Sequence, residues 1–539
     1  MNRAPSLVRP LIILAGVLSW SVGLAQPANE PKAPALPQAF VDTTYRPMAG
    51  RTITVRAGSD LQAVLDSAQP GDTIALEAGA VFRGNFALPN KPGAGWVVVR
   101  TATPDDKFSA PGERVTPATA QLMPKIVSPN SNPAVSALPG AHHYRFVGIE
   151  FGVTPDVSII YAIVALGGSQ TTERDTPHDL IIDRCYVHGQ PRQNSARGVL
   201  LNGASSAVVD SHISEIHGAG FDSQAILGYN GPGPFRISNN FLEAATENIM
   251  FGGADPRIPG LVPSDIEIRG NHLFKPMSWR PGDPGFVGIQ WPVKNLFELK
   301  NAQRVLIEGN VLENVWSTAV VLTPRNQDGT APWSTVRDVL FRNNVVRNVT
   351  TGFIVLASDD IKRSEPTRRV AIVNNLWLGV GRTFFGLTGP VLEDVLIDHN
   401  TAVPVGYSSY YAEMGAKPGL VRFRLTNNLI GFGSYGVPLP KPDETLAALA
   451  PGATITKNAL INLGDTGDGQ GAVRNQPHVI NQAMYTSFPS AAAAGIAADG
   501  TLAPKSPNRR AGTDGKDIGV DFLELQKAVS TSGPRPPEK

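Results

Sequence analysis

The sequence contains little of what stabilises small exported proteins or binds nucleic acids. It has one cysteine, Cys185, in 539 residues, so the chain cannot form an internal disulfide. Its charge is nearly balanced, with 47 Lys and Arg against 46 Asp and Glu, and it therefore lacks the basic excess that indicates a nucleic-acid partner. Beyond the N-terminal region, no apolar run reaches the length of a membrane span. Stability must come from packing and backbone hydrogen bonds.

Glycine and proline are plentiful instead. The chain has 54 glycines and 46 prolines, which favours many turns and few long helices. Hydrophobic residues make up 42% of the chain, enough for a substantial core. We expect a turn-rich protein that is large enough to fold as one extensive unit.

The N-terminus has the pattern of a secretory signal. Arg3 and Arg9 precede the apolar stretch "LIILAGVLSW", and "GLA" ending at Ala25 is a small-residue cleavage site. Residues 1–25 are therefore predicted to be a signal peptide, and the protein is predicted to be secreted or periplasmic, without a membrane span. Residues 26–49 follow as a proline-rich linker, whose composition favours an extended, disordered segment.

From about residue 140 a short strand motif repeats. Examples are "FRISNNFL" (235–242), "IEIRGNHL" (266–273) and "VLIEGNVL" (305–312), in which β-branched residues alternate with polar ones before a bend. One position of the motif is asparagine in most copies, at intervals of 25 to 39 residues. The aligned column reads Cys185, His212, Asn240, Asn271, Asn310, Asn344, Asn375, Asn400, Asn428 and Asn458.

A repeated inward asparagine suits parallel strands that stack coil upon coil. At each bend its amide can bond to backbone groups and to the asparagine one coil away, which satisfies polar groups whose burial would otherwise cost about 1–3 kcal/mol each. Asparagine also tolerates left-handed backbone. The column is thus predicted to be a structural asparagine ladder, with His212 and Cys185 as structural members of it.

With its opening "AGSDLQAVLDSAQPGDTIALEAGAVFRG" (57–84) and its ending "SPNRRAGTDGKDIGVD" (506–521), the repeat resembles the right-handed parallel β-helix proteins of the pectate-lyase-like superfamily. The resemblance implies an all-β fold: a single-stranded right-handed parallel β-helix over 50–525, with an N-terminal capping helix. A disordered tail is expected over 526–539. The same scaffold carries lyases, hydrolases, epimerases and passive surface proteins, so it leaves the activity open.

Candidate site residues follow from aligning the coils. Arg197, Gln224 and Glu247 each stand two residues before an apolar strand segment, which predicts a polar column on one face of the solenoid. Lys294 reaches the same region one coil later, together with Asn295 and Glu298. The loop 219–235 adds more polar groups around a glycine-rich turn, namely Asp222, Tyr229 and Asn230.

Tryptophans concentrate where the ladder interval is longest. Trp279, Trp291, Trp316 and Trp333 all lie between residues 279 and 333. Exposed indoles stack against sugar rings, so Trp279, Trp291 and Trp333 are candidate substrate-binding residues beside Gln224, Tyr229 and Asn230. The alternative is that these indoles pack the loops against the solenoid.

On such a scaffold, β-elimination from a uronic acid needs a base and a neutralised substrate carboxylate. Lys294 or Lys275 is the candidate base, and Arg197 the candidate electrophile, with Glu247 and Asp222 as further catalytic candidates. Calcium is the candidate cofactor, because Glu243, Glu247 and Asp255 offer carboxylate ligands.

We therefore expect a monomeric carbohydrate-active protein with a polysaccharide partner, and a polysaccharide lyase acting on an acidic or plant-type polymer as its activity. One alternative is a glycoside hydrolase, for which Glu247 with Glu243 or Asp222 would be the carboxylate pair. The other is a non-catalytic glycan-binding or surface solenoid. The motifs of polygalacturonases do not occur in their characteristic order in the sequence.

Overall fold

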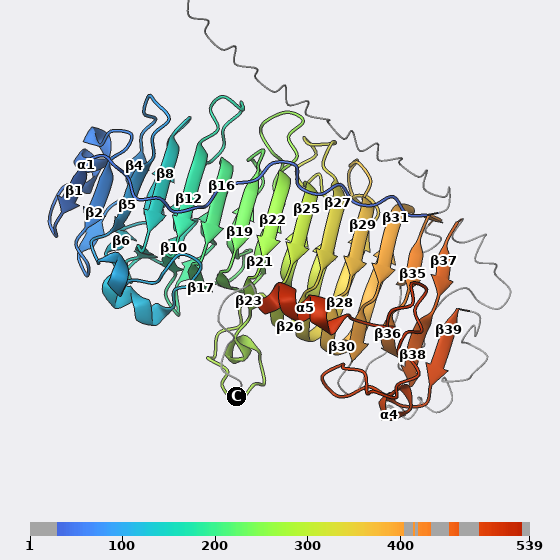
Figure 1. The fold of residues 1–539 in the computed structure, drawn as a ribbon. Coiled ribbons are helices and arrows are strands. Elements are labelled where there is room, and N and C mark those ends of the chain that lie inside the picture. Colours follow the sequence, from blue (N-terminus) through green and yellow to red (C-terminus); the bar gives the residue numbers. More distant parts are fainter. Residues whose placement is uncertain (1–29, 404–412, 415–418, 433–451, 463–483, 531–539) are drawn as a thin grey trace, which may run out of the picture.

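The computed structural model is a long solenoid of parallel strands (Figure 1). It describes residues 30–403, 413–414, 419–432, 452–462 and 484–530. The predicted signal peptide, residues 1–25, lies outside the described residues. Among the described helices, none is both long and apolar enough to cross a bilayer.

One face of the solenoid is a 15-stranded sheet, here called sheet A. Its strands are β1 (Thr52–Val55), β2 (Thr73–Leu76), β5 (Val97–Thr101), β8 (His142–Val147), β12 (His178–Asp183), β16 (Ala204–Val209), β19 (Phe235–Ser238), β22 (Ser264–Arg269), β25 (Ala302–Glu308), β27 (Val336–Arg342), β29 (Arg368–Val373), β31 (Val391–Asp398), β34 (Gly419–Val421), β35 (Arg424–Thr426) and β37 (Thr454–Thr456). All neighbours in this sheet pair in parallel, each with the strand of the next coil.

The other two faces belong to a 22-stranded sheet, here called sheet B. Its strands are β3 (Val81–Arg83), β4 (Phe86–Leu88), β6 (Lys125–Ser128), β7 (Val135–Ala137), β9 (Glu150–Val153), β11 (Val164–Ala165), β13 (Tyr186–His188), β15 (Arg197–Leu200), β17 (His212–Ile216), β18 (Gln224–Gly228), β20 (Phe241–Ala244), β21 (Glu247–Phe251), β23 (His272–Phe274), β24 (Asn295–Leu299), β26 (Val311–Leu322), β28 (Val345–Leu356), β30 (Leu376–Thr388), β32 (Thr401–Val403), β33 (Glu413–Met414), β36 (Leu429–Phe432), β38 (Asn458–Asn462) and β39 (Tyr485–Phe488). The two faces merge because β26 pairs with both β23 and β24.

The helices among the described residues are short and lie outside the coils. They are α1 (Leu61–Ser67), α4 (Ala491–Ala494) and α5 (Phe522–Ser530), with 3-10 turns at Asp105–Lys107, Pro117–Leu122 and Met277–Trp279; strands β10 (Ile159–Ile160) and β14 (Asn194–Ser195) form a small separate pair. As predicted, α1 caps the first coil: Asp60 caps its N-terminus, and Leu61 and Leu65 are buried in the core. Parallel crossovers within a sheet are right-handed, so the fold is a right-handed parallel β-helix.

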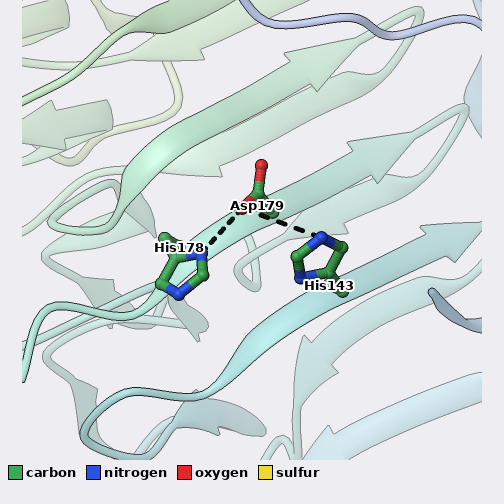
Figure 2. A group of neighbouring side chains, drawn as sticks. All are labelled: His143, His178 and Asp179. Atoms are coloured by element: carbon green, nitrogen blue, oxygen red, sulfur yellow. Dashed lines mark hydrogen bonds and ion pairs between the residues drawn. The ribbon is translucent and has the colours of Figure 1, made fainter. Parts of the chain in front are cut away.

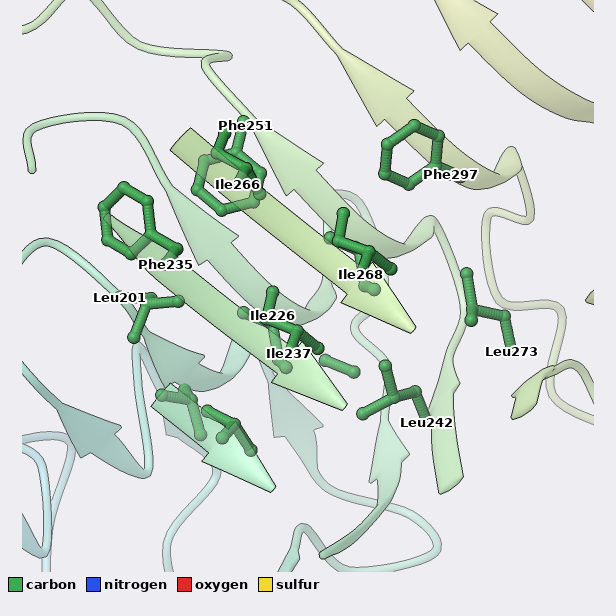
Figure 3. Close-up of a cluster of buried hydrophobic side chains, with 14 of the residues drawn as sticks. Leu201, Ile226, Phe235, Ile237, Leu242, Phe251, Ile266, Ile268, Leu273 and Phe297 are labelled. Atoms are coloured by element: carbon green, nitrogen blue, oxygen red, sulfur yellow. The ribbon is translucent and has the colours of Figure 1, made fainter. Parts of the chain in front are cut away.

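The core runs the length of the solenoid. Inward side chains from all three faces repeat in each coil, as Figure 3 shows for Phe235 and Ile237 of β19 beside Ile266 and Ile268 of β22. Each such side chain, fully buried, contributes roughly 1.5–3 kcal/mol relative to exposure. The alternating apolar residues of the repeat motif therefore build one continuous core.

The asparagine ladder is confirmed from Asn240 onward. The Oδ1 of each ladder asparagine accepts both the backbone N–H and the Nδ2 of the asparagine one coil earlier, at 2.9–3.1 Å. The residue before each is left-handed, as at Asn239 with φ 54°. Every rung thus satisfies two buried donors of its neighbour.

His212 does not belong to this column. Ser211 occupies the ladder position, because its backbone N–H donates to Asn240 Oδ1 and its hydroxyl accepts from the Cys185 backbone N–H. His212 stacks instead on Phe241, with ring centroids 4.4 Å apart. Cys185 is a buried ladder member, and burial raises the pKa of its thiol.

Residues 30–49, placed by sequence in a disordered linker, form an extended segment that we call the strap. The strap crosses the outer face of sheet A from β31 towards β8 (Figure 1). Backbone N–H groups of Lys32, Ala35 and Gln38 donate to side chains of the solenoid at 2.9–3.0 Å. These contacts replace the disorder expected from composition, because every second coil along this stretch offers the strap an acceptor.

Those acceptors belong to a further column, here called the outer column, made of left-handed residues in or beside sheet A strands. It contains His143, Asp179, Ser205, Asp265, Arg304, Asp338, Arg369, Asp394 and Arg422, all with left-handed backbone. Asp265, Asp338 and Asp394 accept the three strap bonds, and each pairs with the arginine of the next coil at 2.5–2.7 Å. The strap therefore rests on alternating aspartates and arginines.

The C-terminal segment folds back along the coils. Asp521 N–H donates to Asn374 Oδ1, and Leu525 of α5 packs with Leu376. Residues 526–530 continue α5 rather than starting a disordered tail, because the helix packs on the solenoid. Residues 531–539 lie outside the described residues.

Candidate functional site

The predicted polar column exists. Arg197 pairs in register with Gln224, Gln224 with Glu247, and Glu247 with Asn295, at the starts of β15, β18, β21 and β24. These strands are consecutive coils of one face of sheet B, so the four side chains stack along the solenoid axis. The ladder enforces this stacking, because it fixes each coil against the next.

Glu247 is the most perturbed member of the column. Its side chain is completely buried, and its Oε2 accepts a 2.7 Å hydrogen bond from Gln224 Nε2. Burial raises the pKa of Glu247 to about 7, and the negative charge of Glu298 adds to the effect. The other oxygen, Oε1, is buried with no hydrogen-bond partner among the described residues. Such a carboxyl can hold or release a proton near neutral pH.

Glu298 and Lys300 extend the site one coil further. Glu298 is buried in β24, where its Oε2 accepts from Asn295 Nδ2 at 2.9 Å. Lys300 Nζ lies 3.6 Å from Glu298 Oε1 and acts to lower the pKa of Glu247. Lys300 was not among the predicted site residues. The sequence feature that could have identified Lys300 is its position directly after the strand of "NLFELKN", five residues beyond the column member Asn295.

Lys294 and Asp222 form an ion pair at the edge of the site. Lys294 Nζ lies 2.6 Å from Asp222 Oδ1, and both side chains are partly exposed. Burial acts to lower the pKa of Lys294, but the Asp222 hydrogen bond and the charges of Asp222 and Glu247 raise it above its ordinary value. Lys294 therefore keeps its proton, which suits a cationic role better than that of a general base.

Arg197 lines a cavity of about 390 Å³ beside the column. Asp222, Gln224, Tyr229 and Lys300 line the same cavity. The Arg197 Nε is buried without a hydrogen-bond partner among the described residues, and burial lowers the pKa of its guanidinium. An unpaired buried guanidinium is costly unless it meets an anion, so Arg197 is suited to bind an acidic ligand.

Of the predicted loop residues, Tyr229 lines the cavity and Asn230 does not. Asn230 is fully buried and bonded to the carbonyls of Gly168 and Gln170, and its Oδ1 accepts from Arg257 N–H. Its polar atoms are used to hold the loops together. Asn230 is thus a structural residue in this fold.

The tryptophans pack loops. Trp279 and Trp291 are each only 4% exposed, and His217 lies against both, stacked on Trp291 with centroids 4.0 Å apart. Trp333 is half-buried, and its Nε1 donates to Leu261 O. The arrangement favours the packing alternative over sugar-stacking platforms for Trp279 and Trp291, whose ring faces are covered.

The carboxylates proposed for calcium do not gather. Asp255 accepts three hydrogen bonds from the loop at Asp328 and Thr330, and Glu243 Oε1 accepts from Glu215 N–H. Glu247 faces Gln224. No group of three among these residues has metal-binding geometry in the described part of the chain. Their contacts fit loop and strand fixation, so the predicted calcium set does not fit the ion.

Lys275, the alternative base, is enclosed. Its Nζ donates to the carbonyls of Ala244, Ala245 and Thr246 at 2.8–3.2 Å and to Asn248 Oδ1 at 3.1 Å. Burial lowers its pKa to about 7, and the charges of Glu247 and Glu243 oppose that shift. Every Nζ hydrogen is directed at the bend between β20 and β21. Lys275 therefore stabilises the conformation of this bend from the interior of the solenoid.

Comparison with known proteins gives similarity of shape only. No family model matches the chain, and no curated protein matches it. Among solved structures, a mutant PL6 family alginate lyase is 12% identical over 90% of this chain and 59% of its own, with a TM-score of 0.47. This chain thus spans about three fifths of that lyase.

Two further solved structures are similar at the same low level. A mannuronic acid specific family 6 lyase from human gut microbiota is 11% identical over 82% of this chain and 92% of its own, with a TM-score of 0.38. Pectate lyase Pel9A is 12% identical over 87% and 96%, with a TM-score of 0.30. The functional argument therefore rests on this chain's own residues.

Proposed function

We propose that the protein is a carbohydrate-active enzyme that cleaves an acidic polysaccharide by β-elimination at the cavity beside the polar column. The observation that carries the proposal is Glu247, a fully buried carboxyl whose pKa is raised to about 7. A proton acceptor works best when its pKa lies near the operating pH. Glu247 meets this requirement, and four cationic side chains interact with it electrostatically, namely Arg197, Lys275, Lys294 and Lys300.

The proposed roles differ from the sequence-based ones for Lys294. Glu247 takes the proton from the carbon next to the uronate carboxylate. Arg197 binds that carboxylate, because its guanidinium lines the cavity and lacks a partner for Nε. Lys294, held protonated by Asp222, adds positive charge. These cations favour the transition state, in which negative charge spreads onto the carboxylate.

The elimination step balances without a co-reactant. The C–H bond next to the carboxylate breaks, its electron pair forms a carbon–carbon double bond, and the glycosidic C–O bond on the adjacent carbon breaks. The proton that Glu247 gained is returned to the leaving oxygen. One chain becomes two, one of them with an unsaturated end that absorbs ultraviolet light.

A calcium requirement remains a prediction, and no step above passes through the ion.

Export also remains a proposal, resting on the signal pattern of residues 1–25. Secreted or periplasmic protein that begins near Gln26 on N-terminal sequencing would support it. Retention of Met1 in protein from the cytoplasmic fraction would contradict it.

The deciding experiment is an ultraviolet assay on a panel of uronate polymers, with and without a chelator. Glu247→Gln should lose about 10²–10⁴-fold in kcat, and Arg197→Ala should raise KM most strongly on uronates. Glu393→Gln is the control, because this half-exposed carboxylate lies on sheet A, where it pairs with Arg422, away from the polar column. Unchanged activity in folded Glu247→Gln would overturn the assignment.

Hydrolysis is the second candidate, and the buried carboxyl of Glu298, whose charge acts on Glu247, favours it. Two nearby carboxyls can act as acid and base on a glycosidic bond. New reducing ends without ultraviolet absorbance would identify hydrolysis. Glycan binding without any product would support the non-catalytic solenoid instead.

A further inference from the structure

Three histidines and an aspartate meet at the outer edge of sheet A, on a different sheet from the polar column. His142 and His143 open β8, and His178 and Asp179 open β12, one coil later. Figure 2 shows His143, His178 and Asp179. His178 pairs in register with His142, so Asp179 lies opposite His143. Two adjacent residues in each of two neighbouring coils thus bring four titratable side chains together.

The ligand atoms are close enough for one small cation. Those of His143, His178 and Asp179 all lie within 4.8 Å of one another. His178 Nδ1 is 2.6 Å from Asp179 Oδ2, and His143 Nε2 is 4.0 Å from the same oxygen. Around a tetrahedral zinc ion, ligands at 2.0–2.1 Å are about 3.3 Å apart, which lies between these two distances. Small side-chain rotations would bring all three into place.

His142 can orient one of the ligands. Its Nδ1 lies 2.7 Å from His143 Nδ1, so one of the two nitrogens carries the shared proton. With the proton on His143 Nδ1, the lone pair of His143 Nε2 faces Asp179. Histidines that bind metals generally donate their other ring N–H in this way. His142 is therefore a positioning residue rather than a ligand.

Asp179 differs from the other aspartates of the outer column. Asp265, Asp338 and Asp394 are each paired with an arginine of the next coil, a permanent cation. Asp179 meets histidines instead. Asp179 thus lacks the fixed positive partner that its counterparts have.

Access to the group is open. A cavity of about 520 Å³ is lined by His143 and Asp179 on the solenoid side and by Asp42 and Thr44 of the strap. The His178 side chain is 41% exposed and the Asp179 side chain 33%. A cation can therefore reach the group from solvent.

We propose that His143, His178 and Asp179 form a binding site for one divalent transition-metal cation, with zinc as its expected occupant. Two imidazoles and one carboxylate suit zinc, nickel or copper, whereas calcium and magnesium prefer sites built of oxygen atoms. The site is independent of the proposed lyase activity. It joins two coils at the point where the strap meets sheet A.

The test is zinc titration by calorimetry on untagged, chelator-stripped full chain. One zinc per chain is expected. His178→Ala and Asp179→Asn should each weaken binding at least tenfold, since even outer partners of a metal ligand contribute about 10–100-fold. His178 is the preferred variant because its partly exposed side chain can be removed with little effect on folding.

The matched control is His188→Ala. His188 is also a strand histidine beside a carboxylate, Glu150 at 3.1 Å, and its side chain is 18% exposed against 19% for His143. Zinc affinity should be unchanged in this variant. Equal zinc affinity in wild type and folded His178→Ala, or no saturable binding by wild type, would overturn the proposal.

A second readout uses Trp96, whose ring centroid lies 5.2 Å from that of His143. Copper or nickel bound at the site should quench part of the tryptophan fluorescence of the chain. The same quenching should be absent from Trp96→Phe and from Asp179→Asn. Equal quenching in wild type and Asp179→Asn would place the bound ion elsewhere and contradict the site.

Discussion

Gln224 Nε2 donates a 2.7 Å hydrogen bond to Glu247 Oε2 between the first residues of two stacked strands. This bond lowers the pKa of Glu247 and so opposes burial and Glu298, which raise it. Gln224 thereby keeps part of the carboxyl population ionised at neutral pH. The proton affinity of Glu247 therefore depends on Gln224, which carries no charge itself.

Gln224→Met should shift the acid limb of the pH–activity profile upward. The methionine cannot donate to Glu247, so the pKa of Glu247 rises and the base is protonated over a wider pH range. We expect the acid limb of the pH profile of kcat to move upward by about half a pH unit or more. Initial rates measured across pH give this shift. Gln303→Met on sheet A is the control, and an unmoved limb would show that Glu247 is not the titrating base.

Glu247→Gln should stabilise the fold at high pH. The folded pKa of about 7 lies above the ordinary value of 4.5, so the folded state holds the proton more tightly. Stability due to this group is therefore lost as pH rises from about 4.5 to 7. Removing the charge should gain about 1–3 kcal/mol above pH 7, and nothing below pH 4.

Chemical denaturation at several pH values measures this difference. Glu150→Gln is the opposing control. Although burial acts to raise the pKa of Glu150, hydrogen bonds from His188 and Lys125 lower it overall, so its carboxylate stabilises the fold at neutral pH. Glu150→Gln should therefore destabilise at neutral pH, and a gain in both variants would refute the burial argument.

Asn310→Ala should destabilise the solenoid strongly. The substitution removes the acceptor of the buried Asn271 backbone N–H and a donor to the Ile268 carbonyl. A loss of about 2–4 kcal/mol is expected, since each unsatisfied group costs about 1–3 kcal/mol. Asn132→Ala, at an exposed turn, should lose less than 1 kcal/mol. Equal losses in urea unfolding would argue against the ladder as a stabilising element.

Trp291→Ala should destabilise the chain rather than weaken sugar binding alone. Trp291 is 4% exposed and stacks on His217. Replacing a buried tryptophan with alanine costs about 3–5 kcal/mol. Thermal unfolding measures this loss, and an unchanged melting temperature combined with lost glycan affinity would restore the sugar-platform interpretation.

Ala35→Pro should loosen the strap without touching the solenoid. It removes the N–H that donates to Asp338 Oδ1. Hydrogen exchange and limited proteolysis should increase across residues 30–40. Ala33→Pro is the matched control, because no described hydrogen bond uses the Ala33 N–H. Equal protection in both variants would mean that the strap does not depend on its aspartates.

The ladder and the polar column could be predicted from sequence because both follow from one repeat. Once Asn240, Asn271 and Asn310 fix the coils, the alignment of Gln224 with Glu247 follows directly. The sequence alignment of the coils was wrong by one residue at His212. The missed signal was Asp210, which takes the left-handed position before the ladder residue, as Asn239 does in the next coil.

Other contacts could not be predicted, because they join segments whose distance depends on loop paths. Asp255 bonds to Thr330, 75 residues later, and Lys275 turns inward to the bend at Ala245. Nothing local to Trp279 or Trp291 reveals that His217 covers them. Composition likewise predicted a free linker, since the acceptors that hold it lie 227 to 362 residues away in sequence.

The strap has a consequence for the order of folding. Its bonded residues Lys32, Ala35 and Gln38 are three apart, and each follows a proline. A polyproline II helix advances about 9.3 Å in three residues, close to the spacing of two coils, roughly 9.5 Å. The first described residue, Glu30, pairs with Arg424, 394 residues away. Complete docking of the strap therefore requires that the coils through β35 are already folded.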